Sequence, residues 1–291
     1  MEEPRNCSQP FFKVRSLAKE KSKCSRRVAR PSPDPLPKGE GDSPNRPFMS
    51  VDRLSIRQQP RGWPLMHQNW GKLLFMHWPI SAELLRPLIP QQLEIDTFDG
   101  SSWIGIVPFT MWAIRASFLP SIPRTSAFHE LNVRTYVHYR GVPGVWFFSL
   151  DAASRLAVWG ARRFYHLPYF NAEMSLRQTG GAITYSSKRF DRRGASAEFE
   201  AAWSIGESLP QSQPDSIEFF LTERYRLYSV QRDRLYSARI YHEPWPLRKA
   251  TLTDHRSTMI ESLELPQSNG EPILLYAESL SVDIWPLSKH E

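Results

Sequence analysis

Beyond position 24 the chain has no cysteine, because its two cysteines are Cys7 and Cys24. The rest of the chain can therefore form no internal disulfide and supplies no thiolate as a nucleophile or metal ligand. Long apolar runs are also missing, since no stretch approaches the roughly 20 residues that span a bilayer. The opening MEEPRN lacks the apolar segment of a secretory signal. These absences predict a soluble protein of the reduced cytoplasm with no membrane partner.

Tryptophan and tyrosine are absent from the first 62 residues, which hold nine of the 25 prolines. This segment has 14 Lys and Arg against seven Asp and Glu, so it carries the whole net charge of +7. Such a composition buries too little apolar surface to offset the entropy cost of ordering its backbone. We expect residues 1–62 to be a disordered, basic, proline-rich tail; a translation start at Met49 or Met66 is the alternative. The remainder is neutral, so we expect no nucleic-acid partner for it.

Residues 63–291 are long enough to bury the core of a single domain. Short apolar or alternating segments between turns predict strands near 72–78, 103–109, 130–139, 145–150, 172–177, 183–190, 197–203, 226–230, 235–242 and 273–285. Helices are predicted after Ser81, over about 153–165, and from Ser216 to about 223. The fold class is therefore α+β and β-rich, with a mostly antiparallel, barrel-like sheet and two or three helices.

The helix over 153–165 is expected to place one apolar or small-residue face against the domain. That face consists of Ala153, Leu156, Ala157, Gly160 and Phe164. An aspartate just before a helix is ordinary capping chemistry, so we interpret Asp151 as part of the start of this helix.

The segment 130–139 alternates with period two and is the most informative part of the chain. Leu131 and Val133 lie on one face, and Glu130, Asn132 and Arg134 lie on the other. In an open antiparallel sheet the polar face meets water, whereas in a closed barrel it points into the interior. In the second case the three side chains can bind a small polar ligand, with Arg134 pairing bidentately with an acid.

Tyr225 lies at the end of the helix predicted from Ser216 and is a further candidate for ligand binding. The alternative for this segment is a structural role, with Glu223 and Arg224 forming ion pairs. The chain has no glycine-rich phosphate loop, no G-x-S-x-G elbow and no H-E-x-x-H helix. Its eight histidines show no tight metal-ligand spacing. The sequence therefore predicts no metal and no cofactor.

Seven short segments together resemble the YqjF-like family, a bacterial domain of unknown function in the acetoacetate-decarboxylase-like superfamily. They are residues 66–70 (MHQNW), 73–79 (LLFMHWP), 93–100 (LEIDTFDG), 130–135 (ELNVRT), 144–152 (GVWFFSLDA), 221–225 (LTERY) and 244–247 (PWPL). The resemblance implies a β-rich, barrel-like fold with an interior cavity.

Enzymes of that superfamily use a lysine that forms a Schiff base with a keto acid, next to a second lysine just after a G-x-P turn. Here the residues after Pro143 are Gly-Val-Trp-Phe, and no lysine occurs between Lys72 and Lys188. The preferred hypothesis is a small-molecule binding protein, with an organic acid as its ligand, or a lysine-independent enzyme. A Schiff-base lyase with a displaced lysine and a non-catalytic interaction module are the alternatives. The sequence leaves the oligomeric state open.

Overall fold

The computed structural model describes residues 51–118, 127–267 and 270–290. Its strands are β1 (Met66–Ile80), β2 (Glu94–Ile95), β3 (Ser102–Ala116), β4 (Phe128–Tyr139), β5 (Val142–Ala152), β6 (Tyr169–Thr179), β7 (Ala182–Arg189), β8 (Glu198–Ser208), β9 (Arg226–Gln231), β10 (Arg234–His242), β11 (Leu247–Ser257), β12 (Ile273–Ile284) and β13 (Ser288–Lys289). The α-helices are α1 (Ala82–Leu85), α2 (Arg155–Gly160) and α3 (Ile217–Thr222). Other helical turns are η1 (Ser55–Arg57), η2 (Arg86–Leu88), η4 (Glu261–Leu263) and the π-helical η3 (Ala161–Tyr165), which continues α2.

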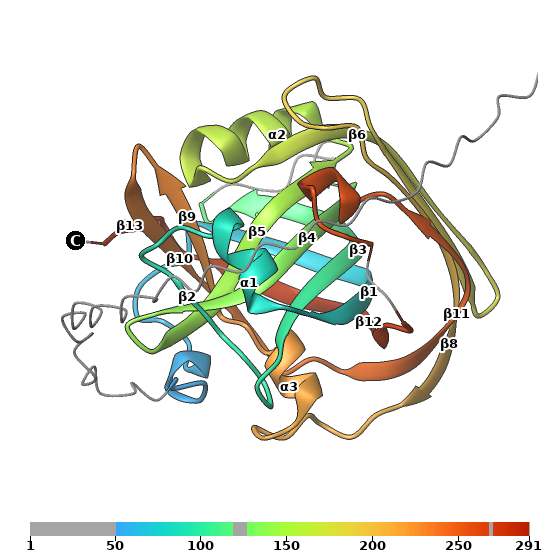
Figure 1. The fold of residues 1–291 in the computed structure, drawn as a ribbon, viewed down its shortest axis with the longest axis horizontal. Helices are drawn as coiled ribbons and strands as arrows, with labels where there is room; N and C mark the ends of the chain where they lie inside the picture. Colours follow the sequence, from blue (N-terminus) through green and yellow to red (C-terminus); the bar gives the residue numbers. More distant parts are fainter. Residues whose placement is uncertain (1–50, 119–126, 268–269, 291) are drawn as a thin grey trace, which may run out of the picture. The chain divides into compact units, whose positions relative to one another are not determined.

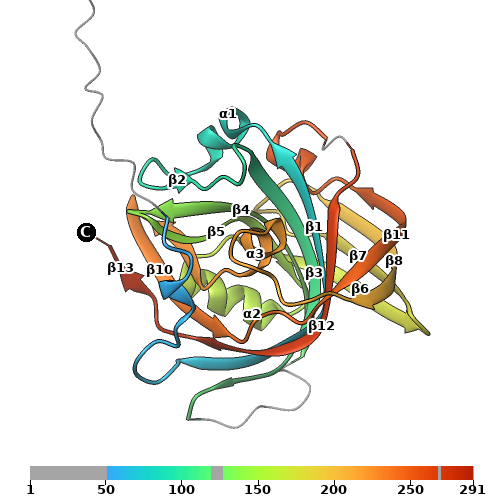
Figure 2. The same cartoon turned by 90° about the horizontal axis from the view of Figure 1, so that it is seen from below.

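The strand pairings close into two rings that share a wall (Figure 1, Figure 2). The wall consists of β12, β1, β3, β4 and β5 in that order. On one side β9 and β10 connect β5 back to β12 and close a ring of seven strands. On the other side β6, β7, β8 and β11 connect the same two strands and close a ring of nine. Only the β5–β6 and β5–β9 pairs are parallel among the described strands, so the expected β-rich, mostly antiparallel fold is confirmed.

Strand β4 is buried on both of its faces because it belongs to the shared wall. Leu131 and Val133 belong to a core cluster that also contains Phe199 and Trp203 of β8. The polar side chains of β4 leave the opposite face, toward the seven-stranded ring. The apolar side chains of β4 therefore enter one ring and its polar side chains enter the other, so neither face of the strand meets solvent.

A serine begins each of the three α-helices. Ser154 Oγ accepts a hydrogen bond from the Ala157 amide at 3.3 Å, and Ser81 and Ser216 act in the same way in α1 and α3. The interpretation of Asp151 as a helix-start residue is wrong. Asp151 lies in β5, fully buried, and its carboxylate accepts a hydrogen bond from Arg189 Nε at 2.8 Å.

The face of α2 that packs on the domain agrees with the expected one at Ala157 and Gly160, which line an interior cavity, and differs from it at other positions. Leu156 and Phe164 are 67% and 56% exposed, whereas Val158 and Tyr165 are buried. The π-helical turn after Gly160 shifts the residues that follow around the axis, so a constant spacing of 3.6 residues does not describe this helix.

Residues 51–62 belong to the folded domain, so the expected tail is wrong over these residues. Ile56 is buried, and Arg53 forms an ion pair with Asp96. Arg239 Nη2 donates to the Ile56 carbonyl at 2.7 Å. The rest of the expected tail, residues 1–50, lies outside the described residues.

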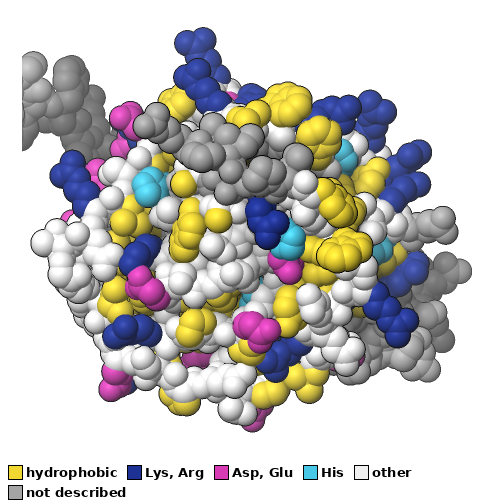
Figure 3. Space-filling model, turned by 180° about the vertical axis from the view of Figure 1, so that it is seen from behind, with side chains coloured by type: hydrophobic (Ala, Val, Ile, Leu, Met, Phe, Trp, Pro, Cys, Tyr) yellow, Lys and Arg dark blue, Asp and Glu magenta, His cyan; other side chains and the backbone are white. Residues whose placement is uncertain are grey.

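Within the described ranges, the helices are all too short or too polar to cross a membrane. On the face opposite to that of Figure 1, hydrophobic, basic and acidic side chains are interspersed (Figure 3).

Candidate functional site

The interior of the seven-stranded ring holds a cavity of about 350 Å³. Every strand of the ring contributes to its lining, and α2 and η3 line one side. Most of the wall is apolar, with aromatic and aliphatic side chains such as Trp70, Phe109, Phe147, Leu227 and Ile240. A cavity of this size and character is typical of a small-molecule site.

The polar groups of the cavity include the trio predicted from the alternation of β4. Glu130, Asn132 and Arg134 line the cavity and are only 3%, 4% and 9% exposed. Because alternate residues of a strand share a face, the trio spans roughly 13–14 Å of the wall. The structure thus selects the interior alternative for this face over the solvated one.

Arg134 is a buried cation that has no carboxylate within ion-pair distance among the described residues. Its Nη2 donates to the Leu221 carbonyl at 3.2 Å, and its Nε has no described hydrogen-bond partner. The guanidinium lies 5.4 Å from the centre of the Phe75 ring. Two other buried arginines, Arg189 and Arg224, each bind an aspartate, at 2.8 and 2.7 Å. Since a buried charge without a counter-charge is costly, Arg134 is the least compensated of these three arginines.

Glu130 does not neutralise Arg134, because its carboxyl group holds a proton at neutral pH. Burial raises the pKa of Glu130 from 4.5 to about 8 against the opposing hydrogen bond from Tyr169, and the charge of Asp151 adds to the rise. The Tyr169 hydroxyl donates to Glu130 Oε2 at 2.6 Å. The cavity therefore carries one positive charge near neutral pH, together with a carboxyl group that can donate a hydrogen bond.

Two amides complete the polar lining. Asn132 Oδ1 is buried and has no described partner, so it is a free acceptor. Gln68 of β1 is 8% exposed, and its Oε1 accepts from Trp70 Nε1 at 2.6 Å. Arg134, Asn132 and Glu130 thus offer a charged donor, an acceptor and a neutral carboxyl group along a single strand.

Tyr225, the fourth predicted residue, lies outside this cavity. Its hydroxyl donates to Glu223, and its ring stacks on His242 with centroids 4.5 Å apart. Glu223 in turn accepts from the Trp245 amide at 3.0 Å, which fixes the end of α3 against the segment before β11. Of the two expected ion pairs, Arg224 forms one with Asp96, whereas Glu223 forms hydrogen bonds and no ion pair among the described residues. The ligand-binding role of Tyr225 stays a prediction.

Tyr169 and Gln68 are cavity residues that the sequence analysis does not identify. Tyr169 is 39 positions from Glu130 and reaches it through the parallel β5–β6 pair. No local pattern marks either residue, because each depends on a strand pairing between distant segments.

None of the four lysines in the described part of the chain lines the cavity. Three of them form ion pairs with glutamates elsewhere: Lys72 with Glu278, Lys188 with Glu198 and Lys249 with Glu207. After Pro143 the first side chain of β5 that lines the cavity is Phe147, which lies opposite Arg134 in the β4–β5 pair.

Residues 67–281 match the protein-family model DUF2071, described as "Uncharacterized conserved protein". The protein YqjF of Bacillus subtilis is 45% identical over 230 residues, which is 79% of this chain and 94% of YqjF. The chain belongs to the YqjF-like family.

Solved structures similar to this YqjF-like fold include enzymes of the acetoacetate-decarboxylase type. The enduracididine biosynthesis enzyme MppR, complexed with pyruvate, matches with a TM-score of 0.55 and 12% identity over 80% of this chain and 93% of its own. An acetoacetate decarboxylase-like enzyme from Sphingomonas wittichii RW1 matches with a TM-score of 0.54 and 10% identity, over 78% of this chain and 94% of its own. Acetoacetate decarboxylase from Legionella pneumophila matches with a TM-score of 0.53 and 12% identity, over 80% of this chain and 92% of its own. At these identities the likeness establishes the YqjF-like fold as acetoacetate-decarboxylase-like and leaves the chemistry open.

Proposed function

We propose that this domain binds a small carboxylic acid with an apolar body inside the seven-stranded ring. The observation that carries the proposal is the Arg134 guanidinium, which is 9% exposed, lines the cavity and has no described carboxylate partner. A ligand carboxylate can accept two parallel hydrogen bonds from a planar guanidinium such as that of Arg134. A carboxylate therefore matches this side chain in geometry as well as in charge.

The remaining lining narrows the ligand class. Aromatic and aliphatic walls favour an apolar body, and Asn132 and the protonated Glu130 favour a hydroxyl or carbonyl group near the carboxylate. Hydroxy acids and keto acids with an aliphatic or aromatic substituent combine these features.

A matched binding experiment tests this assignment. Phenylpyruvate, phenyllactate and hexanoate are expected to raise the melting temperature of the wild-type protein, because they bind only the native state. The neutral hexanamide should produce no shift. The Arg134→Gln variant should bind the acids about tenfold to a hundredfold more weakly in calorimetry, the loss of one charge-assisted contact.

Arg234→Gln is the control for this experiment, because Arg234 is exposed and lies away from the cavity lining. It should bind the acids as the wild type does. Equal affinities of wild type and Arg134→Gln would sink the proposed site.

Catalysis without a lysine is a second candidate, favoured by the Glu130–Tyr169 pair. A carboxyl group with a pKa of about 8 exchanges its proton close to neutral pH, as a general acid or base requires. We expect the wild-type protein to accelerate deuterium incorporation at C3 of phenylpyruvate in D₂O, measured by proton NMR. Glu130→Gln should bind phenylpyruvate and lose the acceleration; an unchanged exchange rate in this variant would exclude Glu130 as the acid or base.

Mass spectrometry can test the Schiff-base alternative, which predicts a reduced lysine adduct. Because the described lysines lie outside the cavity, borohydride with pyruvate should leave no reduced adduct on Lys72, Lys188, Lys249 or Lys289. A stable mass increase mapped to any of these four residues would restore the lyase hypothesis.

A further inference from the structure

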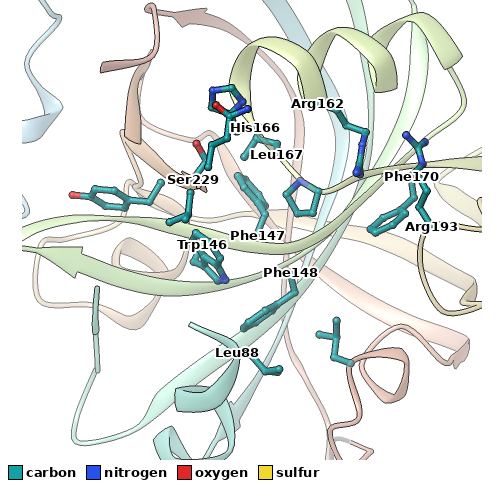
Figure 4. A pocket seen from close by; sticks show the side chains of 15 residues that line it. Leu88, Trp146, Phe147, Phe148, Arg162, His166, Leu167, Phe170, Arg193 and Ser229 are labelled. Atoms are coloured by element: carbon teal, nitrogen blue, oxygen red, sulfur yellow. The ribbon is translucent and has the colours of Figure 1, made fainter. Parts of the chain in front are cut away.

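A second pocket, of about 550 Å³, lies outside the seven-stranded ring (Figure 4). It is lined by Trp146 and Phe148 of β5, by the end of β9, and by the segment that follows α2. Phe147 and Leu167 line both this pocket and the inner cavity, so they separate the two. The polar trio of β4 faces only the inner cavity.

The charge of this outer pocket is positive. Its lining contains Arg162 and Arg193 but no aspartate or glutamate. Arg193 is bound by Asp191, with Nε and Oδ1 2.8 Å apart, so its charge is already balanced. Arg162 Nη1 donates to the Tyr169 carbonyl at 2.9 Å, and Arg162 has no ion pair among the described residues. One net positive charge therefore remains, and it suits a monoanion.

The opposite end of the pocket has polar atoms without partners. Ser229 is 2% exposed, and its Oγ has no hydrogen-bond partner among the described residues. Nδ1 of His166 is buried and also lacks one within the same ranges. Figure 4 shows Ser229 and His166 at one end and Arg162 and Arg193 toward the other. Buried polar groups are normally satisfied, so this end is suited to a ligand that carries a hydrogen-bonding group.

Aromatic rings also line the outer pocket. Trp146 and Phe148 project from β5, and Phe170 lies beside Arg162, with the guanidinium 5.8 Å from the ring centre. Flat apolar surfaces of this kind favour aromatic ligands, which stack on rings or meet them edge to face.

We propose that the outer pocket binds an aromatic monoanion whose anionic group pairs with Arg162 and whose far edge hydrogen-bonds with Ser229 and His166. Its ring packs against Trp146 and Phe148. This site is independent of the acid site in the inner cavity.

The test uses 4-hydroxybenzoate as the probe and Arg134→Gln as the reference protein, so that binding in the inner cavity is already weakened. Calorimetry should show 4-hydroxybenzoate binding to this reference and no binding of the neutral 4-hydroxybenzamide. Adding Arg162→Gln should weaken binding about tenfold or more, the loss of a charge-assisted contact. Adding Ser229→Ala should weaken it severalfold; this change removes an atom without a described partner, so the fold should persist.

The outcomes separate the two sites. Loss of 4-hydroxybenzoate binding on going from wild type to Arg134→Gln would assign the probe to the inner cavity and overturn the outer site. Unchanged affinity in Arg162→Gln and Ser229→Ala would also overturn it, as would equal binding of the amide. If wild type and Arg134→Gln bind the acids of the inner cavity equally, the inner site fails. Weaker 4-hydroxybenzoate binding by Arg162→Gln and Ser229→Ala would still support the outer site.

Discussion

Replacing Arg134 with methionine should raise the melting temperature of the ligand-free protein. The guanidinium is buried without a described carboxylate partner, so its desolvation is not offset by an ion pair. Replacement of a buried ion pair or triad by apolar residues of similar volume is often neutral or stabilises a protein by about 1–4 kcal/mol, and Arg134 has no described ion pair to lose. For a domain of this size each kcal/mol corresponds to about 2–4 °C. The same change should abolish the shift caused by carboxylic acids, so that stability and binding move in opposite directions.

Arg189→Met is the matched control for this prediction. Arg189 is also buried, but it holds the fully buried carboxylate of Asp151 at 2.8 Å. Its removal leaves an unpaired buried acid and should cost about 3–5 kcal/mol. Differential scanning fluorimetry of the two variants makes the comparison. If the melting temperature of Arg134→Met falls as far as that of Arg189→Met, then Arg134 stabilises the ligand-free fold and the argument for an anionic ligand fails.

Glu130→Gln should remove much of the loss of stability that we expect as the pH rises to 8. The folded state holds the Glu130 proton up to a pKa of about 8, whereas the unfolded chain releases it near 4.5. Between these values the unfolded state binds fewer protons, so the free energy of unfolding falls by about 1.4 kcal/mol for each pH unit. This loss in the free energy of unfolding is absent below pH 4.5 and complete above pH 8, where it is on the order of several kcal/mol.

Urea unfolding at pH 6.5, 7.3 and 8 measures this slope. Asp151 contributes in the same direction only below about pH 6, because its pKa is raised by burial, against the pairing with Arg189, to about 6. The wild type should lose stability over the measured range, and Glu130→Gln should not. Glu173→Gln, at an exposed position of β6, should keep the wild-type slope. A slope shared by all three proteins would show that Glu130 ionises normally.

The alternation of residues 130–139 predicts both the strand and the three side chains that line the cavity. It cannot predict that the polar face lies inside, because this depends on the β5–β9 and β10–β12 pairings, which join distant segments. The apolar face is equally buried in either case. The choice between surface and cavity is therefore a property of ring closure and not of the strand itself.

Other errors also have physical causes. β11 is not predicted, because in its sequence LRKATLTDHRS only Leu247, Ala250 and Leu252 are apolar; beyond Leu247 its residues are half-buried or exposed. Asp151 resembles a helix cap from its position, but its actual partner, Arg189, lies 38 residues away. Tyr225 lies apart from the other three predicted site residues because it contacts Glu223 and His242 at the end of α3, and its ligand-binding role stays a prediction.

Strand β12 pairs with β1, β10 and β11, and it is needed to close both rings. Met66 at the start of β1 is paired with Ile284 at the end of β12, so this contact joins opposite ends of the domain. During synthesis on the ribosome, β1 and β10 each keep an unpaired edge until β12 leaves the exit tunnel. Unpaired edges invite association with other chains, and contacts of such large sequence separation form slowly. The nascent domain therefore keeps the inner cavity unclosed, and the edges of β1 and β10 unpaired, until β12 has been translated.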